Sequence, residues 1–224
     1  MNGAVPIEYG YYFDETRPTN YPIYYTDEEI DTYIAMVKKR EYFIYGMTDF
    51  WLWDAYAKYP IFGQSVAIMG STTPWYESSC IHFGGRPTTI EYNTIVPRTT
   101  RMRALTVDAW DAAPETFDAA VSISSFEHDG LGRYGDPLDP DGDLKAMQKM
   151  KRIARPGGLL YLSVPVGRDR ILFKAARVYG SIRFPLLIDG WTEVDRFGFH
   201  PGVLTDEGSI QPVIVLRNGT GARE

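Results

Sequence analysis

The stretch FDAAVSISSFEHDGLGRYGDPLDPDGDL, residues 117–144, decides how the fold is interpreted. Its first eight residues, 117–124, form a nearly continuous apolar run that ends in small hydroxyl residues. Such a run is typical of a strand buried on both faces of a parallel sheet. The remainder is polar, rich in Gly, Pro and Asp, and too long for an ordinary turn. Since open α/β sheets bind ligands at the carboxyl ends of their strands, we expect the chemistry of the protein to lie in this stretch.

Strand-like and helix-like segments alternate on both sides of this stretch, from residue 63 onward. We expect further strands at residues 65–69, 88–92, 103–107, 159–164, 184–188 and 212–217. We expect helices from Pro74 to near Gly84 with Thr73 as N-cap, from Asp141 or Asp143 to Pro156, and over residues 170–179 with Asp169 as N-cap. Such alternation predicts an α/β fold with a Rossmann-like, doubly wound, mostly parallel sheet.

The N-terminal part of the chain lacks this alternation. Residues 1–25 carry prolines among tyrosines without a period, which predicts an arm lying on the body. Residues 26–40 have a capping box, Thr26 with Glu29, and acids in the first turn, which predicts a helix, and residues 48–59 predict a second helix. We therefore expect an N-terminal arm with packed helices at residues 1–60 and a Rossmann-like domain at residues 61–224.

Composition narrows the partners and the compartment. The formal charge of -6 and the absence of a basic stripe argue against nucleic acid, because neutralising phosphates requires clustered Lys and Arg. Cys80 is the only cysteine, so an intrachain disulfide is excluded. We find no signal peptide and no apolar run long enough to cross a bilayer. We therefore expect a cytoplasmic protein that acts on a small molecule and contacts no membrane, with its oligomeric state open.

The turn after the strand at residues 65–69 reads Gly70-Ser71-Thr72-Thr73 and opens a helix. In a nucleotide-binding fold this turn brings backbone N–H groups and a helix N-terminus up to an anionic or polar ligand. Only Gly70 occupies the tight turn here, since hydroxyl residues replace the further glycines of a G-x-G-x-x-G pattern. A dehydrogenase that binds a dinucleotide is therefore the least favoured enzyme class.

Two acids follow the next two strands. Glu91 lies 21 residues after Gly70, at the carboxyl end of the second strand. An acid at this spacing is placed to accept hydrogen bonds from the ribose hydroxyls of an adenosine. Asp108, at the end of the third strand, is a candidate for contacting an adenine amine.

The middle of the 117–144 stretch supplies the candidate catalytic residues, His128 and Asp129. We expect the adjacent carboxylates to raise the pKa of His128 toward neutrality or above, which suits general acid or base work. Alternatively, His128 only hydrogen-bonds the loop. Arg133 and Tyr134 are candidates for orienting a substrate, and Arg168, after the strand at residues 159–164, could clamp a carboxylate or phosphate.

The acids of DPLDPDGD, residues 136–143, raise the question of a metal. Carboxylates bind divalent cations, but the two prolines and the spacing do not fit an EF-hand loop. Asp also favours turns and N-caps, which accounts for the same residues. We predict no metal site and keep a metal-dependent transferase or hydrolase as an alternative.

A longer run, from SSFEHDGLGRYGDP to ARPGGLLYLSVPVGRD at residues 124–169, resembles the domain-of-unknown-function family 268. The resemblance spans residues 42–216. It implies a class I S-adenosylmethionine methyltransferase-like fold, with seven strands of which the last is antiparallel, and S-adenosylmethionine as cofactor. The family label supplies no established activity.

By this resemblance Gly70 marks the cofactor loop, Glu91 binds the ribose and Asp108 lies near the adenine. We also expect Ser71, Thr72 and Glu127 to contact the cofactor. The loop departs from the usual D/E-x-G-x-G-x-G pattern, because the chain reads AIMGSTTPW at residues 67–75.

The leading hypothesis is an S-adenosylmethionine-dependent methyltransferase that acts on an oxygen or nitrogen of a small polar acceptor, such as a sugar. The protein would align the acceptor with the methyl group, while His128 or Asp129 removes the acceptor's proton. The atypical loop at residues 70–74 motivates an alternative, a Rossmann-like protein without cofactor binding that serves as an interaction module.

Overall fold

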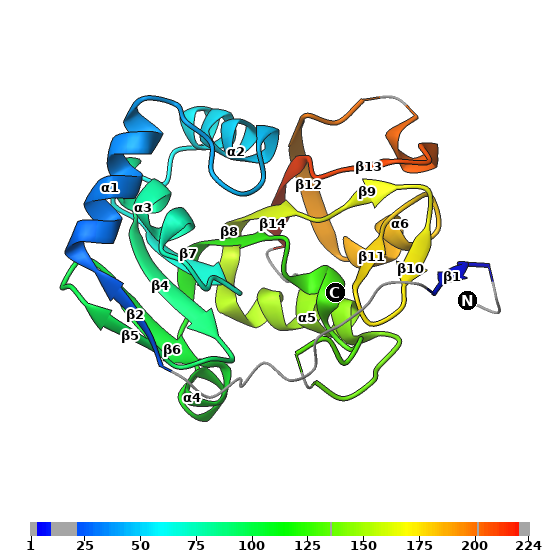
Figure 1. Ribbon diagram of the computed structural model, residues 1–224, viewed down its shortest axis with the longest axis horizontal. Helices are drawn as coiled ribbons and strands as arrows, with labels where there is room; N and C mark the ends of the chain where they lie inside the picture. The colour runs from blue at the N-terminus through cyan, green and yellow to red at the C-terminus, as the bar shows by residue number, and fades with distance from the viewer. Residues whose placement is uncertain (1–3, 10–21, 135, 201, 220–224) are drawn as a thin grey trace.

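A computed structural model describes residues 4–9, 22–134, 136–200 and 202–219. A seven-stranded sheet runs through its centre (Figure 1). In spatial order the strands are β12 (Trp191–Phe197), β14 (Val213–Asn218), β8 (Ala154–Ser163), β7 (Phe117–Ile123), β3 (Ser65–Met69), β4 (Arg86–Glu91) and β6 (Arg103–Thr106). The five strands from β8 to β6 are parallel, whereas β14 is antiparallel to β8. The predicted doubly wound sheet with an antiparallel last strand is therefore confirmed.

Helices cover both faces of the sheet (Figure 1). One face packs against α1 (Asp27–Lys38), α2 (Met47–Lys58) and α3 (Trp75–His82). The other face packs against α4 (Val107–Ala112), α5 (Gly142–Ile153) and α6 (Arg183–Leu187). Successive strand residues alternate between the two clusters, as the pleat requires: Leu160 and Leu162 belong to one cluster, and Tyr161 between them to the other.

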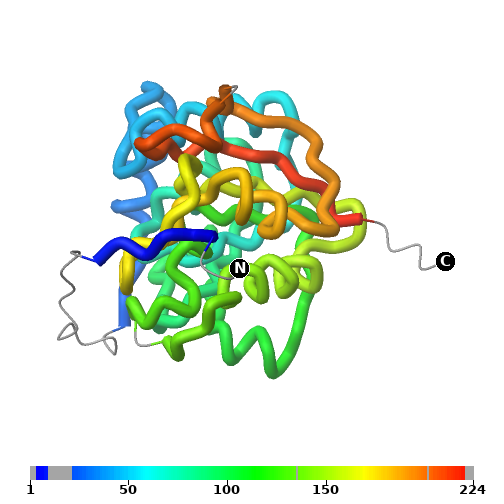
Figure 2. Tube along the Cα trace, turned by 90° about the vertical axis from the view of Figure 1, so that its right-hand side faces the viewer, coloured from blue at the N-terminus to red at the C-terminus, as the bar shows by residue number. Residues whose placement is uncertain are grey.

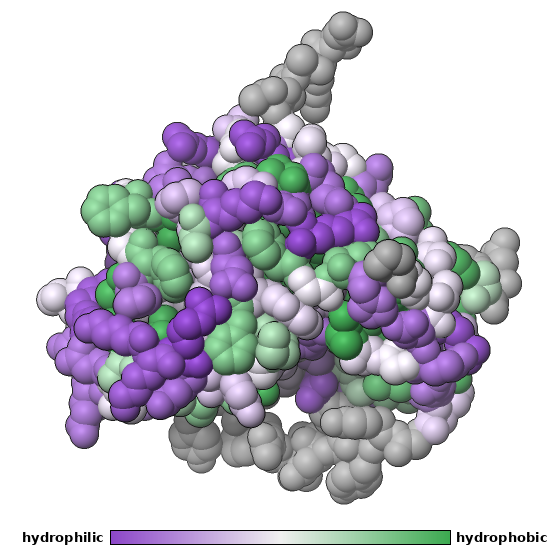
Figure 3. Space-filling view, turned by 90° about the horizontal axis from the view of Figure 1, so that it is seen from above, coloured by the Kyte–Doolittle hydropathy of each residue, from purple (hydrophilic) through white to green (hydrophobic). Residues whose placement is uncertain are grey.

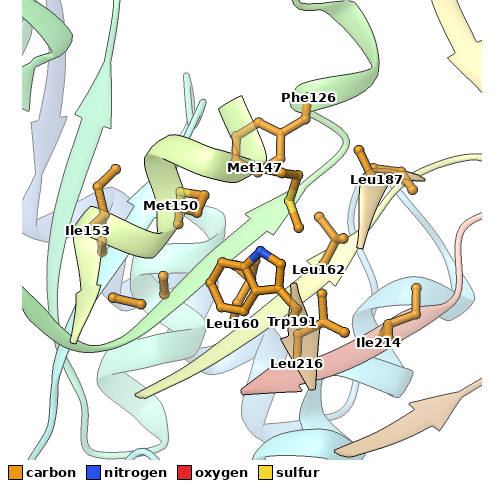
Figure 4. Packing of buried hydrophobic residues seen from close by; sticks show 14 of the residues in the cluster. Phe126, Met147, Met150, Ile153, Leu160, Leu162, Leu187, Trp191, Ile214 and Leu216 are labelled. Atoms are coloured by element: carbon orange, nitrogen blue, oxygen red, sulfur yellow. The ribbon is translucent and has the colours of Figure 1, made fainter. Parts of the chain in front are cut away.

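The cluster under α5 shows how the sequence pattern becomes packing (Figure 4). Met147, Met150 and Ile153 repeat at helical spacing and are fully buried. They pack against Leu160 and Leu162 of β8. Burying each such side chain contributes about 1.5–3 kcal/mol, which fixes α5 and the loop that leads into it.

The N-terminal segments attach to the body by strand pairing as well as by helices. Thr26 and Glu29 form the predicted capping box of α1. Upstream, β2 (Ile23–Thr26) pairs with β5 (Ile95–Arg98), and β1 (Ile7–Glu8) lies along β10 (Arg170–Leu172; Figure 2). The rest of the predicted arm, residues 1–3 and 10–21, lies outside the described residues. The domain boundary near residue 60 stays a prediction.

The segment between β8 and β12 corrects two predictions. Residues 170–179 form the hairpin of β10 and β11 (Ala176–Val178), because the chain turns at Lys174, where φ is 56°. Residues 184–188 fall mainly in α6, where a strand was predicted. Asp169 does bind helix-start N–H groups, but they are those of Ile182 and Arg183, next to α6.

Smaller elements complete the chain. β9 (Val166–Gly167) pairs with β13 (Ser209–Ile210), and two short 3-10 helices are η1 (Phe126–His128) and η2 (Val203–Thr205). Seen from above α2, hydrophobic and hydrophilic side chains are interspersed on the surface (Figure 3). Within the described ranges, every helix is too short or too polar to cross a membrane.

Candidate functional site at the carboxyl ends of β3 and β7

The strand order of the sheet reverses between β3 and β7. From β3 it proceeds to β4 and β6 on one side, and then returns to β7 and β8 on the other. Ligands of open α/β sheets bind outside the carboxyl ends of strands at such a switch point. A cavity of about 60 Å³ lies there. Its lining comprises residues 70–73, Ile123, Ser124 and, from neighbouring elements, Ile44, Tyr45, Trp75 and Tyr76.

The turn after β3 depends on Gly70, whose φ is +67°. A methyl group added there would lie 2.3 Å from Ser125 Oγ, so glycine is needed both for the backbone and for the space. Ser71 turns its hydroxyl inward, toward Glu77 Oε2 at 3.0 Å, while Thr72 is exposed. Thr73 was predicted as the N-cap of α3, but Pro74 occupies that position.

Behind this turn lies Glu77, a fully buried carboxyl that the sequence did not single out. Both of its oxygens accept hydrogen bonds, one from Ser71 Oγ and the other from Thr89 Oγ1 at 2.7 Å. Burial raises the pKa of Glu77 to about 7. Tyr25 also holds the turn, since its hydroxyl donates to the Ser71 carbonyl at 2.8 Å. The turn is therefore tied firmly to α3, β4 and β2.

Glu91 ends β4 and is 7% exposed. Its Oε1 accepts hydrogen bonds from the Asn93 backbone N–H at 3.2 Å and from Asn93 Nδ2 at 2.9 Å. Its Oε2 lies 3.9 Å from where a side chain on Gly70 would begin. The structure thus brings Gly70 and Glu91 together, as the 21-residue spacing suggested. It places Asp108 on the surface, in the first turn of α4.

Glu127 follows β7 and is fully buried. Its Oε1 accepts a hydrogen bond from Ser124 Oγ at 2.5 Å, and burial raises its pKa to about 7. Ser124, which lines the cavity, has a φ of 52° without being glycine. Such a conformation costs about 1–3 kcal/mol and often marks a functional site.

His128 contradicts the predicted direction of its pKa. Burial lowers the pKa of His128 to about 4, an effect larger than the favourable hydrogen bond from Nδ1 to the Ala175 carbonyl at 2.6 Å. The expected raising by neighbouring carboxylates fails because the imidazole is 11% exposed and also faces the Arg133 guanidinium. His128 is therefore neutral near pH 7.

Asp129 has the opposite shift. Burial, together with the negative charge of Asp136, raises the pKa of Asp129 to about 7. Asp136 is itself held by the loop, since its Oδ2 accepts hydrogen bonds from the N–H groups of Gly130 at 2.7 Å and Gly132 at 3.2 Å. Asp129 is thus the better matched of the two catalytic candidates for accepting a proton near pH 7.

A buried ion cluster holds the loop in place, and its two arginines were missed in the sequence. Arg177 on β11 donates to the backbone carbonyls of Asp129 at 2.5 Å and of Asp139 at 3.1 Å. Asp143 accepts a hydrogen bond from Arg183 Nε at 2.8 Å and lies 3.6 Å from Arg177 Nε. Asp143 was predicted as a possible N-cap, but it is a buried counter-ion.

The three remaining candidates are Arg133 and Tyr134, which lie beside His128, and Arg168, which lies elsewhere. Tyr134 is exposed, packs edge-on against His128 at 5.7 Å between ring centroids, and has the Arg133 guanidinium over its ring at 5.4 Å. Arg168 lines a different cavity and pairs with Glu207 at 2.7 Å. Among the described residues, no group of three or more His, Cys, Asp or Glu is arranged to hold a metal ion.

Comparisons with known proteins give a family and a fold. The family DUF268, described as a Caenorhabditis protein of unknown function, matches residues 63–202. No curated protein matches the chain.

Among solved structures, the chain is similar to 1,6-didemethyltoxoflavin-N1-methyltransferase of Burkholderia thailandensis, crystallised with 1,6-didemethyltoxoflavin and S-adenosylhomocysteine. The identity is 16% and the TM-score 0.59, over 93% of this chain and 98% of that one. The chain is also similar to the N-methyltransferase NodS of Bradyrhizobium japonicum WM9, with 16% identity and a TM-score of 0.50, over 75% of this chain and 92% of that one. These likenesses establish the fold.

Proposed function

Because the chain belongs to the DUF268 family and has the fold of class I S-adenosylmethionine-dependent methyltransferases, we propose that it is such an enzyme. It transfers the methyl group of S-adenosylmethionine to an oxygen or nitrogen of a small polar acceptor. The observation that carries the proposal is the meeting of Gly70 and Glu91 beside the cavity at the switch point. The Burkholderia protein, which shares the fold, was crystallised with S-adenosylhomocysteine.

The residues at the switch point fit the cofactor. Asn93 occupies one oxygen of Glu91 and leaves the other beside the Gly70 turn, which suits the paired hydroxyls of a ribose. Ser71 and Thr72 lie in the turn that leads from β3 to α3 and line the cavity, where their backbone N–H groups suit a polar or anionic group of the same ligand. Glu127 has a buried oxygen without a hydrogen-bond partner among the described residues. S-adenosylmethionine supplies the methyl group when bound.

The loop after β7 contributes the acceptor side. Asp129 removes the acceptor's proton, since its pKa of about 7 matches neutral conditions. His128, neutral and fixed by the Ala175 carbonyl, positions the loop and the Tyr134 ring. Arg177 holds the backbone of Asp129, so the base keeps its place as the acceptor binds.

Titration calorimetry with S-adenosylmethionine and S-adenosylhomocysteine tests the proposal. The wild-type protein should bind both, and Glu91→Ala should weaken both by about tenfold or more, because the ribose loses its charged partner. Arg168→Ala, which alters the other cavity, is the control and should bind as the wild type does. Absence of binding of either compound at millimolar concentration would refute the proposal.

One observation favours a second function, an interaction module without cofactor. Ser125 Oγ lies close against Gly70, and the cavity of about 60 Å³ is small beside ligand pockets of roughly 300 Å³ and more. This alternative predicts no binding in the same titrations. An ordered adenosine group in crystals soaked with S-adenosylhomocysteine would dispose of it.

A further inference from the structure

Glu127 is an incompletely satisfied carboxyl group in the interior. Its side chain is 1% exposed. Oε1 accepts a hydrogen bond from Ser124 Oγ at 2.5 Å, and Ser124 Oγ accepts one in turn from Gln211 Nε2 at 3.0 Å. Oε2 has no hydrogen-bond partner among the described residues. One oxygen is therefore held in a chain of hydrogen bonds, and the other is bare.

This arrangement favours the neutral acid. A buried carboxylate oxygen that is neither solvated nor hydrogen-bonded is costly when the group is ionised. Since Oε1 already receives the Ser124 proton, the acid's own proton belongs on Oε2. The raised pKa of Glu127, about 7, has the same cause, burial.

Charged and titratable groups of both signs lie near Glu127. His128 Nε2 lies 3.6 Å from Oε1 and is neutral, while the Arg133 guanidinium lowers the pKa of Glu127. Arg177, on β11, donates to the Glu127 carbonyl at 3.4 Å, and the Asp129 carboxyl opposes it. The other titratable groups that sense Glu127 are Tyr134 and Tyr179. A further positive charge in the cavity at the switch point would act in the same direction as the Arg133 guanidinium and favour the ionised form of Glu127.

We propose that Glu127 is a neutral acid in the ligand-free protein and releases its proton to solvent when a positively charged ligand binds, so that the site prefers the sulfonium cofactor to its neutral thioether product. This inference rests on the proposed function. It makes Glu127 the residue that distinguishes S-adenosylmethionine from S-adenosylhomocysteine.

The two ligands differ by one methyl group and one positive charge, and share every other titratable group. Ser124, the partner of Glu127, lines the cavity together with residues 70–73. A unit charge near a buried carboxylate shifts its pKa by about one unit or more, which corresponds to about a tenfold preference. The titration of groups common to both ligands cancels in the ratio of their affinities.

The experiment measures the affinities of S-adenosylmethionine and S-adenosylhomocysteine by calorimetry between pH 5.5 and 8.5. In the wild type, preference for S-adenosylmethionine should rise about tenfold with pH, because the ionised carboxylate attracts only the sulfonium. Glu127→Gln should remove most of this rise, and the small remainder belongs to Asp129, whose pKa is also about 7. A wild-type ratio that does not change with pH, or a rise in Glu127→Gln as large as that of the wild type, would overturn the inference.

Glu77→Gln is the matched control, because Glu77 is equally buried and also has a pKa of about 7, but has both oxygens hydrogen-bonded. In Glu77→Gln the ratio of the two ligand affinities should rise with pH as in the wild type. A ratio that stays constant with pH in Glu77→Gln would show that Glu77, and not Glu127, causes the rise, and would contradict the inference. If neither ligand binds any variant, the proposed function fails. If both bind with a constant ratio, only this inference fails.

Two further measurements do not depend on Glu127→Gln being folded. Infrared difference spectra of the wild type at pH 6 should show that S-adenosylmethionine weakens the protonated carboxyl band, by about half of one carboxyl group, and that S-adenosylhomocysteine leaves the band unchanged. Ser124→Gly, which removes the donor to Oε1 and suits the positive φ, should move the rise of the ratio to higher pH. An unchanged band, or an unmoved rise, would contradict the inference.

Discussion

The two loops that meet at the switch point are built differently. The loop after β3 is fastened by Glu77, whose two oxygens both accept hydrogen bonds from hydroxyl groups. The loop after β7 contains Glu127, which has the same burial but one bare oxygen. Glu77 therefore uses both of its oxygens to hold the fold, whereas Glu127 keeps one oxygen without a hydrogen-bond partner among the described residues. Equal burial and similar pKa values therefore do not imply equal roles.

The largest effect should come from the ion cluster that supports the loop after β7. Asp143→Ala leaves Arg177 and Arg183 buried without their counter-ion. Breaking a buried pair in this way costs about 3–5 kcal/mol in the free energy of unfolding, measured by urea denaturation. Lys145→Ala, which removes an exposed ion pair with Asp139, is the control and should leave the free energy of unfolding nearly unchanged. Equal losses in the two variants would contradict the buried cluster.

The next effect concerns the loop after β3. Gly70→Ala and Gly63→Ala both place a side chain at positive φ, but only at Gly70 would the methyl group meet another residue, Ser125. Both should lose about 1–2 kcal/mol of stability from the backbone. Gly70→Ala should lose more, and should also lose binding of S-adenosylhomocysteine by calorimetry, whereas Gly63→Ala binds normally. Equal stability and equal binding in the two variants would show that Gly70 does not belong to the binding site.

The pH dependence of stability sharpens the comparison of the two glutamates. The pKa of Glu77 is raised in the folded protein, so its contribution is fully present below its unfolded pKa and is lost as the pH rises through about 7. Glu77→Gln should therefore gain stability relative to the wild type between pH 5 and pH 8, as measured by denaturation at each pH. A difference that stays constant over this window would show that Glu77 is ionised throughout.

The smallest effect is expected at Arg168, which belongs to neither loop. Its ion pair with Glu207 is exposed, so Arg168→Ala should change the free energy of unfolding by less than about 1 kcal/mol. Neither methyl transfer nor cofactor binding should change in this variant. A tenfold loss of cofactor affinity in this variant would extend the site to the second cavity.

Much of the fold followed from local patterns. Buried strands and amphipathic helices such as α5 are recognisable from periodicity, and their alternation predicts the doubly wound parallel sheet. The antiparallel last strand came from the family resemblance. Prediction failed at residues 170–188, where short apolar segments suit either a helix or a strand, and where the Asp169 cap acts on α6 rather than on the residues directly after it.

The site was less predictable, for a physical reason. Gly70 and Glu91 come together because they lie at the carboxyl ends of β3 and β4, which are adjacent parallel strands. Arg183 and Asp143 are 40 residues apart, and Arg177 is 50 residues from the Glu127 carbonyl that it contacts. No local sequence pattern therefore predicts these contacts. The predicted direction of the His128 pKa was wrong for a related reason. Burial, which cannot be read from the sequence, has a larger effect on this pKa than the adjacent charges.

The hairpin of β10 and β11 has a consequence for how the protein can evolve. It carries Arg177, which holds the loop after β7, yet it lies outside the seven-stranded sheet and pairs with β1. Substitutions in the hairpin can therefore change the shape of the loop after β7 while Gly70 and Glu91 stay in place. If the proposed function holds, evolution can change the acceptor through this hairpin without altering the residues proposed to bind the cofactor.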